Sequence, residues 1–491
     1  MQLLLEREKI EGEELKALVQ EPVHSSKGGF QSVAAGGRRM RKGFSAAERL
    51  VVFCRYPAPG RVKTRLVPEL GPLGAAELHR RLTERVISLA GAVAAGRRAD
   101  LEIAYAGGSR QAMERWVGRG PTLVPQSGRD LGARMEAVFL SAFREGARRV
   151  VLVGTDIPGL ASVHLDRALD ALSSANVVLG PSLDGGYWLI GLDRPAGVFR
   201  SVPWGTAEVR ARTLALVSRL GLRVHELDPL RDVDTSDDLR DEGWVRSLRG
   251  PFVSVIIPAF QEEAHVASAV RSARDEEAEI LVVDGGSTDA TVRRAAGAGA
   301  RVVSGPRGRA LQQNRGREES AGRVLLFLHA DSRLPEGYAG AVFRTLLESG
   351  TAAGAFRFRT DGSGPMMRMV EGMTNIRSRL FQLPYGDQGI FLRREVFEGV
   401  GGFPEVAIAE DLLLVRRLAR WGRIRIADRA VVTSARRWRS LGVLRTTLIN
   451  QVILAGCLWG DRRTSYPRSI DPNGRTELRE DRGAQSPCAA R

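Results

Sequence analysis

Short apolar runs alternate with longer amphipathic stretches along this chain, and the alternation occurs in two successive sets. Such alternation is typical of strands and helices that build a mostly parallel sheet. We therefore predict an α/β fold with two such sheets in tandem. The apolar runs cover residues 49–54, 99–107, 148–154 and 175–180 in the first set, and residues 252–258, 279–286, 300–305 and 324–331 in the second.

The domain organisation follows from the length of 491 residues, which exceeds what one hydrophobic core usually serves. We predict one domain over residues 47–248 and a second over residues 251–463. The two domains are joined near Gly250 and Pro251, a pair of residues that is common in linkers.

Both ends of the chain are polar and lack sustained periodicity. Residues 1–46 indicate a mobile N-terminal extension, and residues 464–491 indicate a disordered tail. Either Met1 or Met40 is compatible with the true start. The first residues turn charged after a few apolar positions, which argues against a secretory signal and predicts a cytoplasmic protein.

The charge is strongly positive, with a formal net charge of +16 and a sequence pI near 10.7. Almost all of this charge is arginine spread along the chain, and aromatic residues are only 6%, so the composition favours phosphate-bearing ligands over nucleic acid. The 3 cysteines show no metal-type spacing and are too few for a disulfide framework. No GxGxxG motif follows the first strand of either domain, which disfavours a Rossmann dehydrogenase.

Acidic residues follow two strands of the second domain. Asp331 ends the run LLFLHAD, and Asp284 and Asp289 follow the run ILVV. Such residues often only cap the next helix. Two acidic strand ends in one domain, however, favour a polar ligand with a divalent cation, because Mg²⁺ or Mn²⁺ is commonly held by one or two carboxylates and a diphosphate.

Five motifs in the second domain carry a resemblance to a known family. VSVIIPAFQEE, ILVVDGGSTDAT, LLFLHADS, YGDQGIF and EDLLLVRRL follow in this order across residues 253–418. Together they resemble the inverting family 2 glycosyltransferases of the GT-A fold. The segments GRALQQNRG, GGFPEVAIAED and ARRW are similar to a bacterial subfamily named for arsenosugar biosynthesis. The resemblance implies a nucleotide-sugar donor, a hydroxyl-bearing acceptor, and transfer with inversion in the presence of Mg²⁺ or Mn²⁺.

The resemblance also implies roles for individual residues. Asp331 is expected on the metal, although His329-Ala330-Asp331 replaces the more usual Asp-x-Asp triplet. Asp411 is the expected general base and Glu410 its neighbour, and the two carboxylates are able to exchange roles. The alternative is that both acids only favour the N-terminus of the following helix. The donor is expected at Glu262, Asp284, Asp289 and Arg437, and the acceptor at Asp387, Gln388 and Trp438. For Arg437 and Trp438 the alternative, a surface arginine beside a packed tryptophan, is about as good as a ligand contact.

The first domain has a cationic loop, RYPAPGRVKTRL, directly after a predicted strand. Its Lys63 and Arg65 suit a loop that cradles phosphates. Asp156 follows another apolar strand, where a metal ligand is expected. The sequence Asp184-Gly185-Gly186 suits close approach of the chain to a ligand, or else a simple hairpin turn. Asp232 and Asp234 form a further acidic pair.

These motifs, with QSGRDLGARM at residues 126–135, resemble a second bacterial arsenosugar-biosynthesis glycosyltransferase family, and more distantly guanylyl nucleotidyltransferases. The resemblance implies a GT-A-like domain that binds a nucleotide or nucleotide sugar. We therefore interpret the chain as a bifunctional glycosyltransferase. Two alternatives for the first domain stay open: a nucleotidyltransferase that makes an activated donor, and a non-catalytic sugar-nucleotide-binding module.

The segment Ser440 to Gly460 has apolar residues at spacings of three and four, interrupted by polar ones. This pattern predicts an amphipathic helix rather than a membrane span. Such a helix either packs on the sheet or lies at the inner face of the cell membrane as a peripheral, salt-sensitive contact.

Overall fold

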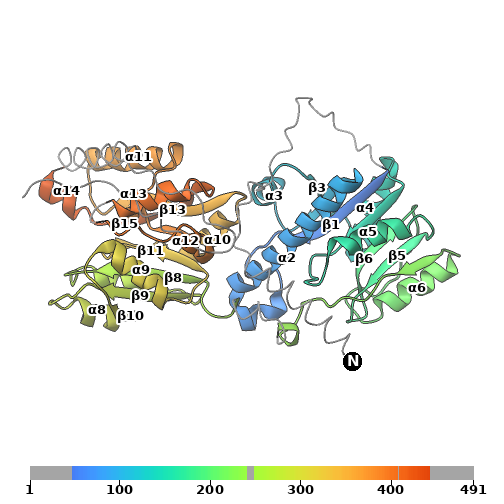
Figure 1. The fold of residues 1–491 in the computed structure, drawn as a ribbon, viewed down its shortest axis with the longest axis horizontal. Helices are drawn as coiled ribbons and strands as arrows, with labels where there is room; N and C mark the ends of the chain where they lie inside the picture. Colours follow the sequence, from blue (N-terminus) through green and yellow to red (C-terminus); the bar gives the residue numbers. More distant parts are fainter. Residues whose placement is uncertain (1–46, 240–247, 407–408, 443–491) are drawn as a thin grey trace, which may run out of the picture. The chain divides into compact units, whose positions relative to one another are not determined.

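The computed structural model describes residues 47–239, 248–406 and 409–442. Strands and helices alternate in two sets, each built around its own sheet, so the predicted tandem α/β architecture is confirmed (Figure 1). Both sheets belong to one compact unit that ends at Ala435, and a second unit begins at Arg436. Within the described ranges, no helix is both long and apolar enough to cross a lipid bilayer.

The first sheet has seven strands among the described residues, in the order β3-β2-β1-β4-β6-β5-β7, and only β6 runs antiparallel to its neighbours. Its strands are β1 (Glu48–Arg55), β2 (Asp100–Ala106), β3 (Thr122–Pro125), β4 (Arg149–Val153), β5 (Val177–Pro181), β6 (Tyr187–Leu192) and β7 (Val224–Glu226). The helices of this set are α2 (Val67–Arg97), α3 (Arg110–Val117), α4 (Leu131–Arg144), α5 (Ser162–Ala171) and α6 (Val209–Arg219).

The second sheet has eight strands among the described residues, in the order β10-β9-β8-β11-β14-β13-β15-β12. They are β8 (Val253–Ala259), β9 (Ala278–Asp284), β10 (Arg301–Ser304), β11 (Val324–Phe327), β12 (Ser332–Arg333), β13 (Thr351–Thr360), β14 (Ile390–Arg393) and β15 (Arg423–Thr433). Its helices are α7 (Val266–Ser272), α8 (Thr291–Gly297), α9 (Arg309–Glu319), α10 (Tyr338–Leu347), α11 (Pro365–Leu380), α12 (Arg394–Gly399) and α13 (Glu410–Leu418).

One reversed strand decides where the loops of the second sheet meet. Strands β8, β9 and β11 are parallel, with Ala259 beside Asp284, so their carboxyl ends share one edge. Strand β14 is antiparallel to β11 and places Ile390 beside Phe327. The start of β14 therefore lies where β11 ends. A short 3₁₀ turn, η4 (Gly386–Gln388), leads into β14 and reaches the same edge as the loop after β11.

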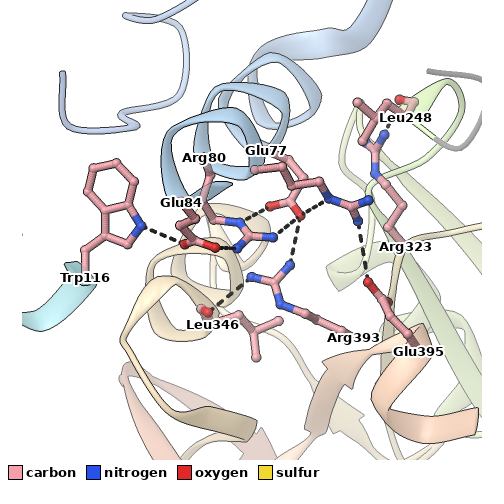
Figure 2. Close-up of polar contacts among 10 residues, drawn as sticks. Glu77, Arg80, Glu84, Trp116, Leu248, Arg323, Leu346, Arg393 and Glu395 are labelled. Atoms are coloured by element: carbon pink, nitrogen blue, oxygen red, sulfur yellow. Dashed lines mark hydrogen bonds and ion pairs between the residues drawn. The ribbon is translucent and has the colours of Figure 1, made fainter. Parts of the chain in front are cut away.

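A buried carboxylate on α2 joins residues from both sets of elements. The carboxylate of Glu77 accepts hydrogen bonds from Arg80 (2.7 and 2.8 Å), from Arg81 (2.9 Å) and from Arg393 of β14 (2.9 Å), as Figure 2 shows in part. Glu77 is 1% exposed. Burial raises the pKa of Glu77, but Arg393, Arg80 and Arg81 outweigh it and hold the pKa well below its usual range. Glu77 is thus the shared anion of three arginines.

The predicted strands coincide with observed strands, with one informative difference. Strand β11 ends at Phe327, so His329 and Asp331 lie in the loop after the strand rather than at its end. The turn between β5 and β6 contains Asp184, Gly185 and Gly186, as the hairpin alternative predicts. Both predicted tails, and residues 443–460 of the predicted amphipathic helix, fall outside the described residues.

Candidate functional site

Gly386 brings two of the predicted motifs into contact at the edge described above. Its backbone amide donates a hydrogen bond of 2.6 Å to Oδ2 of Asp411, at the start of α13. A β-carbon at Gly386 would lie 2.8 Å from Nε2 of His329 and 3.1 Å from Oδ2 of Asp411. Only glycine allows this approach, so its small size is required for contact rather than for backbone freedom.

Asp387 is a half-buried acid of this group. Its Oδ1 is buried and has no hydrogen-bond partner within the described part of the chain. Burial raises the pKa of Asp387 to about 6; Arg377 opposes the rise, whereas the negative charges of Asp411 and Asp331 add to it. The carboxylate of Asp387 is therefore close enough to those of Asp331 and Asp411, from two other motifs, to be repelled by both.

Hydroxyl groups fix the loop after β11 against the end of β15. The hydroxyls of Ser332 and Thr433 lie 2.9 Å apart, and Thr433 Oγ1 also donates to the carbonyl of Asp387 at 2.9 Å. The backbone amide of Ser434 donates to the carbonyl of Asp331 at 3.0 Å. These contacts hold the backbones of Asp331 and Asp387 in place. Thr433 belongs to none of the motifs found in the sequence.

Glu410 lies beside Asp411 but faces a different partner. It is 2% exposed, and its Oε1 accepts a hydrogen bond of 3.2 Å from Arg309, the first residue of α9. Burial and then the charge of Asp411 raise the pKa of Glu410, while Arg309 opposes them. The two acids at the start of α13 therefore lie in different surroundings, because Glu410 is in an ion pair with Arg309 whereas Asp411 accepts a hydrogen bond from the turn before β14.

The predicted donor residues follow β8 and β9. Oδ2 of Asp284 accepts hydrogen bonds from the amides of Gly286 (3.0 Å) and Ser287 (2.9 Å). Its Oδ1 is buried and has no hydrogen-bond partner among the described residues. Asp289 instead bridges two backbones, because its carboxylate accepts from the amides of Glu263 (3.2 Å) and Thr291 (2.9 Å).

Two of these loops are tied to each other through Glu262. Its amide donates to the hydroxyl of Thr291 at 2.8 Å. Asp284 and Glu262 therefore lie on neighbouring loops, and the contacts of Asp289 stabilise this loop pair.

Gln388 has an internal role in the described fold. It is fully buried, and its amide oxygen accepts from Ser378 of α11 at 2.7 Å while its nitrogen donates to the carbonyl of Phe356 at 3.0 Å. Its predicted contact with an acceptor stays a prediction. Arg437 and Trp438 lie in α14 (Arg436–Leu441), within the second unit, and their predicted contacts also stay predictions.

The residues around Asp331 fit a divalent cation that also has non-protein ligands. No three histidine, cysteine, aspartate or glutamate side chains of the described residues come together as a metal cluster. Asp331 is half-buried beside the two other acids, and the unpartnered oxygen of Asp387 indicates an unmet demand for positive charge. Mg²⁺ and Mn²⁺ sites with one or two carboxylates are normally completed by diphosphate oxygens and water.

Acidic residues also gather at one edge of the first sheet, where Lys63 pairs with two of them. Nζ of Lys63, in the loop after β1, lies 2.9 Å from Oδ1 of Asp156 and 3.2 Å from Oδ1 of Asp234, and donates to the carbonyl of Val233. The Lys63 side chain is 3% exposed. Its ammonium pairs with Oδ1 of Asp156, so a metal at Asp156 would have to compete with Lys63 for that oxygen, and the metal site stays a prediction.

Arg65 and Asp184 lie differently. Arg65 is 70% exposed and touches the other oxygen of Asp234 at 3.2 Å, so its guanidinium remains accessible to a phosphate. Asp184 accepts hydrogen bonds from the hydroxyl of Ser182 and the amide of Gly186 within its own turn. Burial raises the pKa of Asp232, and the charges of Asp184 and Asp234 add to the rise while Lys63 opposes it, so Asp232 lies near both acids and near Lys63.

Two family models match separate parts of the chain. Residues 254–401 match the family described as glycosyl transferase family 2. The protein is a glycosyltransferase with a family 2 domain. In this glycosyltransferase, residues 89–206 match a second family, described as an uncharacterized protein conserved in bacteria, DUF2064. The matches confirm a fusion of two different families, whereas the link to arsenosugar biosynthesis stays a prediction.

Several solved structures resemble parts of the glycosyltransferase. A Desulfovibrio desulfuricans protein, provisionally described as a nucleotide-diphospho-sugar transferase, is 34% identical over 41% of this chain and 91% of its own, with a TM-score of 0.38. The mannosyltransferase PcManGT of Pyrobaculum calidifontis, solved with GDP-Man and Mn²⁺, is 24% identical over 38% of this chain, with a TM-score of 0.31. The glucosyl-3-phosphoglycerate synthase of Mycobacterium tuberculosis, solved with Mn²⁺ and UDP, is 23% identical over 38% of this chain, with a TM-score of 0.28.

The glycosyltransferase spans only part of two of these proteins, 57% of the mannosyltransferase and 71% of the synthase. None of the curated proteins matches the chain.

Proposed function

We propose that the family 2 domain transfers a sugar from a nucleotide-sugar donor to an acceptor hydroxyl, with inversion and with the help of a divalent cation. The single observation that carries this proposal is that the segments of Asp331, Asp387 and Asp411 lie together at one edge of the sheet, because single-displacement transfer needs one carboxylate to take the acceptor proton and another to hold a cation that stabilises the departing diphosphate.

Asp411 is the proposed general base. The acceptor oxygen forms a bond to the anomeric carbon while the bond from that carbon to the diphosphate oxygen breaks, and the hydroxyl proton passes to Asp411. Glu410, paired with Arg309, orients the start of α13. A cation held by Asp331 would neutralise charge on the departing nucleoside diphosphate.

The donor nucleoside is proposed to bind at the loops of Asp284 and Glu262, where one oxygen of Asp284 is free to accept a ribose hydroxyl. Asp289 supports these loops, and Arg437 would contact the diphosphate. Asp387 would contact the transferred sugar or the acceptor. Gln388 is assigned to holding η4 in place, because its amide is already bonded to Ser378 and Phe356.

Donor turnover of Asp411→Asn and Glu410→Gln tests these roles. Asp411→Asn should slow transfer by roughly 10²-fold or more, the usual contribution of a positioned base, without weakening donor binding. Glu410→Gln should have a smaller effect, because its carboxylate faces Arg309 rather than the turn before β14. Equal losses of binding and transfer in Asp411→Asn would mark Asp411 as structural. A larger loss of transfer in Glu410→Gln would exchange the two roles.

For the first domain we propose binding of a nucleotide or nucleotide sugar at the loop after β1. The exposed guanidinium of Arg65 supports a phosphate contact, and Lys63 shapes the loop through Asp156 and Asp234. Asp156 would serve as a metal ligand only if Lys63 moved away. Isothermal titration with nucleotides and an Arg65→Ser variant tests the binding, and pyrophosphate release from a triphosphate would favour the nucleotidyltransferase alternative.

A further inference from the structure

A large cavity is lined by residues from both sets of elements, within the one compact unit that ends at Ala435. Its volume of about 680 Å³ falls in the range of sites that hold small molecules. Tyr56, directly after β1, and helix α3 contribute to the lining from the first set. The second set contributes residues of α10, α11, β13 and β15.

Arginines dominate the lining of this cavity. Six arginines stand against two carboxylates, those of Glu348 and Asp428, which leaves four positive charges in excess. Like charges gathered in one cavity repel one another, and such a cavity concentrates anions from the surrounding solution. The six are Arg115, Arg344, Arg357, Arg379, Arg423 and Arg425.

Both carboxylates of the lining already face arginines. Arg425 lies 2.8 Å from Glu348, and Arg115 lies 3.6 Å from the same carboxylate. Asp428 lies 4.0 Å from Arg344. The two acids are thus engaged by three of the six arginines.

The other three arginines present their guanidinium groups to the cavity without an acid. They are Arg357 of β13, Arg379 of α11 and Arg423 of β15, and all three are exposed. In the part of the chain that the structure describes, none of the three pairs with a carboxylate. A guanidinium is a planar fork of donors that binds a phosphate group through two parallel hydrogen bonds.

The first domain adds an aromatic pair beside these charges. The rings of Tyr56 and Trp116 pack edge to face, with their centres 5.9 Å apart. Trp116 is held in place because its indole nitrogen donates to Glu84 at 2.8 Å (Figure 2). Burial raises the pKa of Tyr56 while Arg115 and Arg344 oppose the rise, so the Tyr56 hydroxyl lies near two of the arginines.

The cavity is separate from the candidate transferase site. Strands β13 and β15 run parallel, with Arg423 beside Thr351 at their starts and Thr433 beside Thr360 at their ends. The cavity includes Arg423, whereas the candidate site includes Thr433. At a rise of about 3.3 Å per residue, these two ends of β15 lie about 30 Å apart.

We propose that this cavity binds a compact molecule that carries two or more phosphate groups. A diphosphate supplies the negative charges that the three unpaired guanidinium groups lack, and the volume admits a diphosphate with or without an attached nucleoside. The lining from both sets of elements favours a small molecule over a nucleic-acid strand, which needs an open groove with several aromatic side chains. This proposal does not rest on the proposed transferase function.

Titration calorimetry of the full chain with inorganic pyrophosphate tests the site. EDTA in the buffer removes divalent cations, and with them the cation that would hold a diphosphate at Asp331. The wild type should bind pyrophosphate, more weakly as the salt concentration rises. The variant Arg357→Gln/Arg379→Gln/Arg423→Gln should bind about 10-fold or more weakly, with an unchanged melting temperature because the three side chains are exposed. The single change Arg379→Gln should weaken binding in the same direction.

Two control variants should bind pyrophosphate like the wild type. Arg212→Gln/Arg219→Gln/Arg293→Gln removes the same number of charges from exposed positions of α6 and α8. Arg65→Ser changes the proposed phosphate contact of the first domain and leaves the cavity intact.

Four outcomes overturn the proposal. Absence of pyrophosphate binding by the wild type excludes the site. Equal weakening by the two triple variants shows a general effect of net charge. Weakening by Arg65→Ser alone moves the binding to the loop after β1. Tight binding of a short single-stranded RNA, with no competition by pyrophosphate, assigns the arginines to a nucleic acid.

Sugar transfer gives an independent readout. If the wild type binds pyrophosphate as described but transfers no sugar, the proposed function fails and this binding site remains.

Discussion

The amide of Gly386 donates a hydrogen bond of 2.6 Å to Oδ2 of Asp411. This contact joins the turn before β14 to the first turn of α13, two segments that are distant in sequence. The carboxylate of Asp411, the proposed base, is therefore held by the same turn that carries Asp387.

Gly386→Ala tests the close approach at this contact. The added methyl group would meet Nε2 of His329 at 2.8 Å and Oδ2 of Asp411 at 3.1 Å, so a backbone must shift. We expect turnover to fall by at least about 10-fold, with a loss of about 1–3 kcal/mol in the free energy of unfolding. Gly297→Ala in α8 is the control, because a β-carbon there meets no atom within 4 Å. Equal effects in both variants would contradict the prediction.

Glu77→Gln tests the shared anion of α2. Removing its charge leaves Arg393, Arg80 and Arg81 without their common partner. Breaking a buried ion pair from one side typically costs about 3–5 kcal/mol. Urea unfolding should show a loss of this order. Glu395→Gln is the control, since Glu395 is 36% exposed and touches Arg81 only at 3.5 Å, and it should change stability by less than about 1 kcal/mol.

Glu102 predicts a pH dependence of stability. It is 2% exposed, and burial raises its pKa to about 7, with Arg49 opposing the rise and Glu145 adding to it. A raised carboxyl pKa means that the fold prefers the protonated form. The stabilisation is complete below the ordinary pKa of 4.5 and is lost as the pH rises to about 7.

Comparison of the wild type with Glu102→Gln between pH 4 and 8 measures this effect. The wild type should lose up to about 3 kcal/mol relative to the variant across this range, because one pKa unit corresponds to about 1.4 kcal/mol. A constant difference between the two unfolding free energies would show that folding does not raise the pKa of Glu102.

Lys63→Met tests the internal cation of the first sheet. The change leaves Asp156 and Asp234 facing each other without the ammonium that lies within 3.2 Å of both. We expect a lower melting temperature at neutral pH and partial recovery with Mg²⁺, which would then replace the lost charge. Arg61→Met, in the same loop, should show neither change. A Lys63→Met variant that is as stable as the wild type would remove Lys63 from this role.

The alternation of strands and helices could be predicted from the sequence, because apolar periodicity is a local signal. The residues that complete the site had no such signal. Gly386 is one of 55 glycines, and only its contact with Asp411 distinguishes it. Thr433 lies in a strand without a motif, yet its hydroxyl reaches the carbonyl of Asp387. Such contacts depend on the antiparallel direction of β14, which periodicity does not report.

The position of Lys63 was beyond sequence reasoning for a related reason. A cationic loop and an acidic strand end predict that phosphate and metal bind side by side. Whether the two groups instead neutralise each other depends on a distance, 2.9 Å between Lys63 and Asp156, that only the folded chain defines. Gln388 illustrates the same point, because its place within a motif does not reveal that its amide is fully buried.

The reversed strand β14 has an evolutionary consequence. The chain leaves the edge of the candidate site after β12 and returns to it at η4, so residues 334–385 form a closed excursion that contains α10, β13 and α11. Both ends of this excursion are anchored at the same edge. Its outer parts can therefore change in sequence or length while Asp331 and Asp387, on either side of it, keep their positions. Changes in the outer parts of residues 334–385 would therefore alter what lies beside this edge without moving the loop of Asp331 away from the turn of Asp387.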